Sequence, residues 1–133
     1  MARPTRLVTR PGDRAAVGEA KEQAACRYLE GQGLYLVARN HRCRHGEIDL
    51  IMRDANTLCF IEVRFRKSLD FGGASASITS AKQRRIARAA LFYLSSLGKN
   101  PWQQSLRFDA LLIQQQPGSD LDFNWIRNAF YAE

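Results

Sequence analysis

The chain has 133 residues, a length typical of one domain that buries its own core without disulfides or a structural metal. With 45% hydrophobic and 25% charged residues, its composition is that of a folded globular protein and not of a disordered one. No apolar run approaches the ~18 residues that a membrane span needs. The three cysteines have no CxxC spacing, which is typical of reduced thiols, so we expect a cytoplasmic protein without a membrane partner.

The net charge of +7 is concentrated in one segment of the chain. Residues 71–107 contain no Asp or Glu but carry six of the 20 basic residues, which leaves 14 basic against 13 acidic residues elsewhere. A net positive charge alone fits either a polyanionic partner or simple solubility. Its concentration in one segment favours the partner.

Hydrophobic periodicity predicts two helices and five strands in this chain. The predicted helices cover residues 14–30 and 81–97. The predicted strands cover residues 34–38, 47–52, 58–65, 107–113 and 121–126. Residues 40–44 are predicted to be a basic connector, and residues 69–79 a connector rich in Gly and Ser.

This pattern divides the chain into a short N-terminal arm and one domain. Residues 1–13 contain Arg and Pro without a hydrophobic period and are predicted to be a flexible basic arm. Residues 14–133 form a single predicted domain. The order helix, three strands, helix, two strands is typical of an α/β domain with a mixed sheet flanked by helices.

The second predicted strand alternates between two faces. Ile48, Leu50 and Met52 are predicted to share one face, and Asp49 leaves the other. Glu47 leaves the same face as Asp49, where it is either an outer metal ligand or a surface residue at the edge.

The hairpin formed by the second and third strands brings two carboxylates together. If residues 54–57 form its turn, Asp49 lies opposite Glu62, with Cβ atoms ~4.5–5.5 Å apart. Two carboxylates at that distance repel, so either both spread into water or a divalent cation lies between them. Ile51 and Phe60 share this face, and a wholly exposed face would not usually carry them, which favours the cation.

The ligands available here are hard oxygen atoms. Such atoms suit Mg²⁺ or Mn²⁺, which bind through one or two carboxylates and keep several waters. Arg64 leaves the same strand face two residues after Glu62, where a cation can hold the scissile phosphate. Two carboxylates, metal-bound water and a nearby cation are the parts of a site that hydrolyses phosphodiesters.

Four segments in this order and spacing resemble the YraN family of small bacterial proteins: GEIDLI at residues 46–51, FIEVRFR at 60–66, TSAKQ at 79–83 and RFD at 107–109. The resemblance covers about residues 18–130. It implies a fold of the restriction-endonuclease-like superfamily, related to Holliday-junction resolvases. It also implies a magnesium-dependent endonuclease that cleaves DNA, including branched or junction DNA. By analogy with resolvases, which act on two-fold symmetric junctions, a homodimer is expected.

The superfamily pattern is an acidic residue on a helix, then Asp, then Glu-x-Lys. Carried over residue by residue, it implies that Asp49, Glu62 and Glu22 hold the metal, with Glu19 as the alternative helix acid. Arg64 occupies the Lys position, which departs from the pattern. An Arg cannot act as a general base but can stabilise charge at phosphorus, so a non-catalytic DNA-binding protein with a degenerate site is the alternative function.

The basic residues of the second helix have no acidic neighbour to pair with. They form either a solvated face or, as the resemblance implies by placing this helix beside the carboxylates, a phosphate-binding surface. The residues expected to contact DNA are Arg66, Lys82, Gln83 and Arg85. Gln83 also fits a capping box with Ser80, so it is either a capping residue or a site residue.

Overall fold

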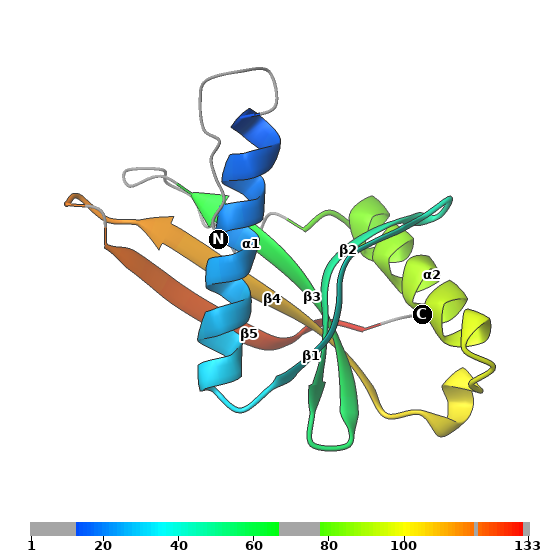
Figure 1. The fold of residues 1–133 in the computed structure, drawn as a ribbon. Helices are drawn as coiled ribbons and strands as arrows, with labels where there is room; N and C mark the ends of the chain where they lie inside the picture. Colours follow the sequence, from blue (N-terminus) through cyan, green and yellow to red (C-terminus); the bar gives the residue numbers. More distant parts are fainter. Residues whose placement is uncertain (1–12, 67–77, 119, 132–133) are drawn as a thin grey trace, which may run out of the picture.

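The computed structural model describes residues 13–66, 78–118 and 120–131, which form one mixed sheet between two helices (Figure 1). In chain order the elements are α1 (Asp13–Gly31), β1 (Tyr35–Cys43), β2 (Gly46–Asp54), β3 (Thr57–Arg66), α2 (Ser80–Ser96), the 3₁₀-helix η2 (Pro101–Gln103), β4 (Leu106–Gln115) and β5 (Leu121–Phe130). The sheet has the strand order β1-β2-β3-β4-β5, and only β3 and β4 are parallel. The predicted α/β class, mixed sheet and element order are therefore confirmed.

The first strand is longer than predicted, and the predicted connector over residues 40–44 is wrong. Residues 41–43 continue β1 and pair with β2, His41 with Ile48 and Arg42 with Glu47. β1 is an edge strand, so its polar and basic side chains can point into water while its backbone still pairs on one side.

Two predicted segments lie wholly or mostly outside the described residues. Residues 1–12 of the predicted arm lie outside the described residues, and α1 begins at Asp13. Most of the predicted Gly- and Ser-rich connector also lies outside them. Neither helix, over the part of the chain that the structure describes, is long and apolar enough to span a membrane.

Each face of the sheet is covered by one helix. The cluster under α2 contains Ile48, Ile51, Leu58, Phe60, Ile86, Ala87, Ala89, Ala90, Leu94, Phe108 and Phe130. The cluster under α1 contains Ala25, Cys26, Leu29, Leu34, Leu50, Met52, Cys59, Ile61, Leu111 and Ile113. The strand β3 alternates between the two clusters, because its even-numbered residues face α2 and its odd-numbered residues face α1.

One predicted face of β2 is wrong. Ile48 packs with Ile51 under α2 instead of sharing the face of Leu50 and Met52. The closed end of the β1–β2 hairpin reaches across to α2 (Figure 1), and β2 turns its face along the way. At Gly46 (φ +153°) an added Cβ would lie 3.3 Å from the Cβ of Arg85, so the hairpin end approaches the helix closely at this glycine.

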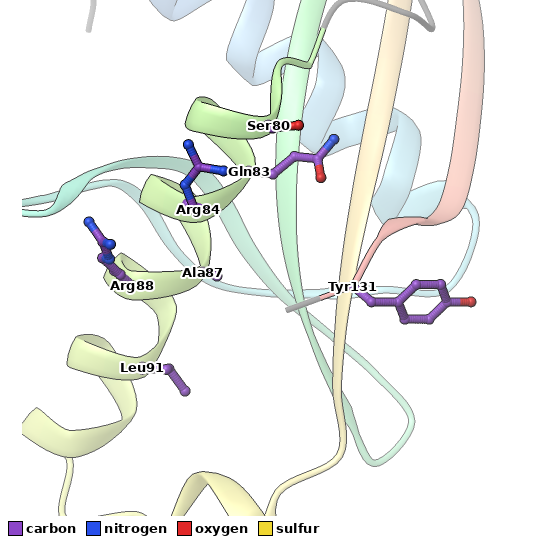
Figure 2. A pocket seen from close by; sticks show the side chains of 7 residues that line it. All are labelled: Ser80, Gln83, Arg84, Ala87, Arg88, Leu91 and Tyr131. Carbon is purple, nitrogen blue, oxygen red and sulfur yellow. The ribbon is translucent and has the colours of Figure 1, made fainter. Parts of the chain in front are cut away.

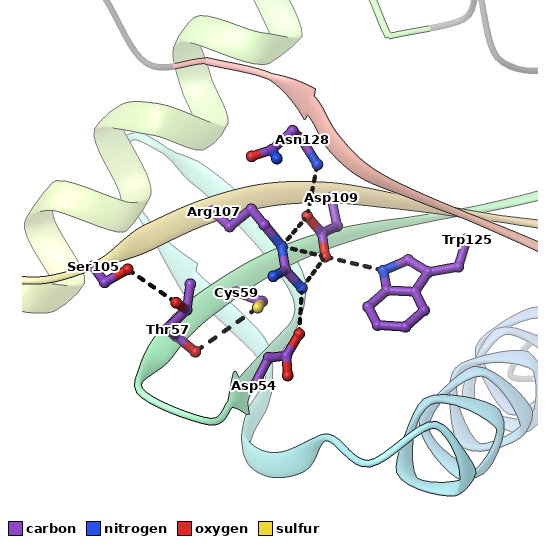
Figure 3. Close-up of polar contacts among 8 residues, drawn as sticks. All are labelled: Asp54, Thr57, Cys59, Ser105, Arg107, Asp109, Trp125 and Asn128. Atoms are coloured by element: carbon purple, nitrogen blue, oxygen red, sulfur yellow. Dashed lines mark hydrogen bonds and ion pairs between the residues drawn. The ribbon is translucent and has the colours of Figure 1, made fainter.

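A buried ion pair on β4 is hydrogen-bonded to β5 and to the end of β2 (Figure 3). Asp109 is fully buried and accepts hydrogen bonds from Arg107 Nε (2.9 Å), Trp125 Nε1 (3.0 Å) and the backbone N–H of Asn128 (3.1 Å). Arg107 also donates to Asp54 at the β2–β3 turn (3.0 Å). Burial lowers the pKa of Arg107, but the hydrogen bonds to Asp109 and Asp54 raise it by more than burial lowers it. The net shift is upward, so the guanidinium stays charged. The network therefore holds β5 and the β2–β3 hairpin to β4.

We predict that Asp109→Ala strongly destabilises the fold, because it leaves Arg107 without its buried partner and Trp125 Nε1 without an acceptor. The free energy of unfolding should fall by about 3–5 kcal/mol, measured by chemical denaturation. Asp120→Ala is the matched control, because Asp120 is exposed beside the same pair of strands and should change stability by less than about 0.5 kcal/mol. Equal stability of the two variants would contradict a structural role for the network.

Candidate metal and phosphate site

The β2–β3 hairpin has the predicted register. Its pairs run from Asp54 with Thr57 at the turn to Leu50 with Ile61. Beyond the last pair, Asp49 Oδ2 accepts a hydrogen bond from the backbone N–H of Val63 at 2.8 Å. This contact places the Asp49 carboxylate close to Glu62, the residue that precedes Val63 on β3.

Glu62 is a buried carboxylate flanked by two cations. It is only 4% exposed, on a strand position where its neighbours Phe60 and Ile61 are fully buried. Its Oε2 lies 3.1 Å from Lys82 Nζ and 3.6 Å from Arg64 Nη1. Lys82 comes from the first turn of α2, so the parallel β3-α2-β4 connection brings a cation to the strand from 20 residues away along the chain.

Asp49 has the opposite environment. Burial, and then the negative charge of Glu62, raise the pKa of Asp49 from 3.8 to about 7, although the Val63 hydrogen bond lowers it. The charges of Glu22 and Glu47 raise it further. Asp49 is therefore a buried carboxyl group close to other carboxylates, an environment that would favour a bound cation.

The predicted helix acid lies near this pair. Glu22 on α1 is half-buried, and its charge acts on Asp49, whereas Glu19 is exposed. Both glutamates line a cavity of about 320 Å³ between α1 and the β1–β2 hairpin, together with Glu47. Of the two alternatives, the structure places Glu22 in the better position to act with Asp49.

The donor atoms fit a hard divalent cation, but the three predicted ligands do not form a closed site. Within residues 13–66, 78–118 and 120–131, no three His, Cys, Asp or Glu side chains come together as a metal site. Asp49 and Glu62 remain an adjacent carboxylate pair. Mg²⁺ commonly binds through one or two carboxylates and fills its other positions with water or substrate phosphates, so Asp49 and Glu62 are the residues that could hold it.

The start of α2 differs from the predicted capping box. The N-cap is Thr79, not Ser80, and its side chain accepts a hydrogen bond from the backbone N–H of Lys82 at 3.1 Å. Gln83 does not point at the carboxylates. Its Nε2 donates to the carbonyl of Ile78 at 3.0 Å, so it supports the entry to the helix.

The remaining predicted DNA contacts are spread around the carboxylates. Arg66 is half-buried at the end of β3, and with Arg64 it lines a cavity of about 190 Å³. Arg85 is exposed and packs its Cβ against Gly46 at the hairpin end. The structure thus gathers Lys82 and Arg64 on Glu62, and leaves Arg85 on the surface of α2.

Two features were missed by reasoning from the sequence. The first is the direct ion pair of Lys82 with Glu62, which no local pattern could indicate. The second is the role of Asp109, whose position within an otherwise apolar strand was the available signal for a buried, fully bonded carboxylate.

Comparison with known proteins agrees with the resemblance seen in the sequence. Residues 21–113 match the family described as uncharacterised protein family UPF0102, which is the YraN family. The UPF0102 protein of Nitrosospira multiformis is 52% identical over 113 residues, covering 85% of this chain and 91% of the relative. Those of Nitrosococcus oceani (46% identical, 93% and 98% covered) and Nocardia farcinica (45% identical, 84% and 87% covered) are also similar.

We predict that Asp49→Asn stabilises the protein at alkaline pH. A carboxyl whose pKa is raised by folding costs stability as the pH rises from about 4 to about 7, because the folded state must give up a proton that it holds more tightly. Asn removes this cost and can still accept the Val63 hydrogen bond. The melting temperature should rise by several degrees near pH 8 and change little near pH 4.

The control for this measurement is Asp120→Asn, an exposed carboxylate outside the site. It should leave the melting temperature unchanged at both pH values. A gain for Asp49→Asn that is as large near pH 4 as near pH 8 would contradict the assigned pKa shift.

Proposed function

The chain belongs to the uncharacterised protein family UPF0102, and from the geometry of its carboxylate pair we propose that it is a metal-dependent endonuclease that hydrolyses phosphodiester bonds in DNA. The observation that carries this proposal is the contrast between two neighbouring carboxyl groups. Burial and the negative charge of Glu62 raise the pKa of Asp49 to about 7, while Glu62 itself is paired with Lys82 and Arg64. A divalent cation bound to Asp49 would stabilise its charged form, and a phosphate could bind Lys82 and Arg64, the two cations beside Glu62.

The roles of the residues follow from this arrangement. Asp49 and Glu62 would hold Mg²⁺ or Mn²⁺, with Glu22 close enough to add charge. When bound, the metal supplies an activated water and a counter-charge for the phosphate oxygens. Its ligands are hard oxygen atoms, as these ions prefer.

The cations hold the DNA backbone. Arg64 presents a rigid guanidinium that suits two phosphate oxygens at once, and it remains charged at any physiological pH. The Lys82 ammonium is a compact charge at the end of a flexible side chain, so it can contact a phosphate while it stays close to the Glu62 carboxylate. Arg66 and Arg85 extend the positive surface along β3 and α2, which would position the strand on either side of the scissile bond.

A second function is favoured by one specific observation. Lys82 and Arg64 both neutralise Glu62, and neither the Arg64 guanidinium nor a Lys82 ammonium in an ion pair is an effective general base. A protein with this arrangement could bind DNA without cutting it. The two functions differ in whether turnover occurs, not in which surface meets the DNA.

We predict divalent-dependent cleavage of DNA by the purified protein, assayed on linear duplex, flap and four-way-junction substrates with Mg²⁺ or Mn²⁺. Asp49→Ala and Glu62→Ala should each lower the cleavage rate by roughly 100-fold or more. Asp120→Ala, which removes an exposed carboxylate outside the site, should leave the rate unchanged.

The same preparation separates the two functions. Salt-dependent DNA binding by the wild-type protein with no cleavage of any substrate would establish the non-catalytic alternative. Cleavage that survives both carboxylate substitutions would contradict the proposed site. Preference among the three substrates reports whether branched DNA is the preferred form.

A further inference from the structure

A cavity of similar size lies beside each of the two helices. The cavity beside α2, of about 330 Å³, is lined in part by Arg84, Arg88 and Tyr131, whose side chains point away from one another and do not converge on a ligand (Figure 2). The cavity beside α1, of about 320 Å³, lies between that helix and the β1–β2 hairpin. Polar and charged side chains line it, among them Glu22 and Asn40, so this is the cavity that bears on the proposed metal site.

The cavity beside α1 lies next to the proposed metal ligand Asp49. Glu22 and Glu47 line this cavity. After burial and the charge of Glu62, the charges of these two glutamates raise the pKa of Asp49, so they lie close to its carboxyl group. Glu47 is held at the cavity by an ion pair with Arg42, whose Nε lies 3.3 Å from Glu47 Oε2. A cation on Asp49 would therefore border a space with room for several water molecules.

Asn40 lies in β1 across from Asp49. His41 pairs with Ile48, so the residue before the first of them lies opposite the residue after the second. Asn40 has φ +54°, in the left-handed region that residues with a side chain rarely adopt. The neighbouring strand changes face here, since Ile48 packs under α2 and Leu50 under α1. A residue with positive φ lets β1 follow the same turn.

The backbone alone does not require asparagine at this position. Glycine adopts a positive φ without steric cost, and it occupies such a position elsewhere in the chain, as at Gly98 after α2 (φ +72°). Asparagine is the other residue that enters this region most readily, and it brings a side-chain amide with it. The Asn40 side chain lines the cavity beside α1, so its amide is placed where the cation would be.

The lining of the cavity matches the chemistry of a hydrated cation. Mg²⁺ and Mn²⁺ keep several waters when they bind through one or two carboxylates. The oxygen atoms of these waters point at the metal, so the waters donate hydrogen bonds outward. The Asn40 side-chain oxygen and the carboxylates of Glu22 and Glu47 all accept hydrogen bonds. Side chains that orient the shell of a metal in this way typically contribute about 10- to 100-fold to its affinity.

We propose that Asn40 positions the divalent cation of the carboxylate site, by accepting a hydrogen bond through its side-chain oxygen from a water that the cation keeps. This inference rests on the proposed function, because it adds a residue to the same metal site. Asn40 is a positioning residue and makes no direct bond to the metal. Its left-handed backbone and its side-chain oxygen are separate properties, and substitution can remove the second while it keeps the first.

The test is Mn²⁺ binding to the metal-free protein, followed by the electron paramagnetic resonance signal of the free ion. Asn40→Gly keeps the left-handed backbone and loses the oxygen, so it should bind Mn²⁺ roughly tenfold more weakly than the wild type. Its melting temperature without metal should change little, because glycine tolerates this conformation. Asn40→Asp keeps an oxygen acceptor and should bind at least as tightly as the wild type.

Asn128 supplies the matched control. It is an exposed asparagine within a strand, with φ +55°, but it lies in β5 at the opposite edge of the sheet from β1. Its backbone N–H donates to Asp109, and Asn128→Gly keeps that group. Asn128→Gly should therefore bind Mn²⁺ as the wild type does.

The outcomes separate this inference from the proposed function. Wild-type affinity in Asn40→Gly, or a loss in Asn40→Asp as large as in Asn40→Gly, would overturn the role of Asn40 and leave the carboxylate site standing. An equal loss in Asn40→Gly and Asn128→Gly would overturn it too, because the change to glycine alone would then lower the affinity. If the wild-type protein binds no Mn²⁺, the metal site and the role of Asn40 are overturned together.

Discussion

The antiparallel register between β2 and β3 is the constraint on which the functional surface depends. The pairing starts at Asp54 and Thr57 and ends at Leu50 and Ile61. Beyond it, the Asp49 side chain accepts a hydrogen bond from the backbone N–H of Val63, two residues after Ile61 on β3. A shift of β2 by one residue would turn the Asp49 side chain to the opposite face of the sheet while Glu62 stayed in place, and would separate the two carboxylates. The buried network around Asp109 protects this register, because Arg107 bonds Asp54 at the turn and so ties the hairpin to β4.

The two carboxyl groups of the site have different electrostatic environments. Glu62 is paired with two cations that come from different elements, whereas Asp49 is buried and the charges of Glu62, Glu22 and Glu47 raise its pKa. A carboxyl group whose pKa is raised by folding lowers stability near neutral pH, and perturbed pKa values cluster at functional sites. The helix α2 contributes to this site through its first turn, from which Lys82 reaches Glu62.

Much of this arrangement could be predicted from local patterns. Alternation and a short turn were sufficient to predict the β2–β3 register, although the pairing ends at Leu50 and Ile61, one pair before Asp49 and Glu62. The spacing of apolar residues was sufficient to predict α2. The failures came from tertiary contacts. Ile48 changes face where the hairpin crosses α2, and β1 continues through polar residues because it is an edge strand. The contact of Lys82 with Glu62 depends on how the crossover packs, which no spacing within either element encodes.

Calorimetric titration of Mn²⁺ into the metal-free protein without DNA tests most directly whether Asp49 and Glu62 together hold a divalent cation. We expect saturable binding to the wild-type protein, and affinities at least roughly tenfold weaker in Asp49→Asn and in Glu62→Gln. Asp120→Asn should bind as the wild type does. No binding by the wild-type protein, or equal affinity in all four proteins, would contradict a metal site formed by these two carboxylates.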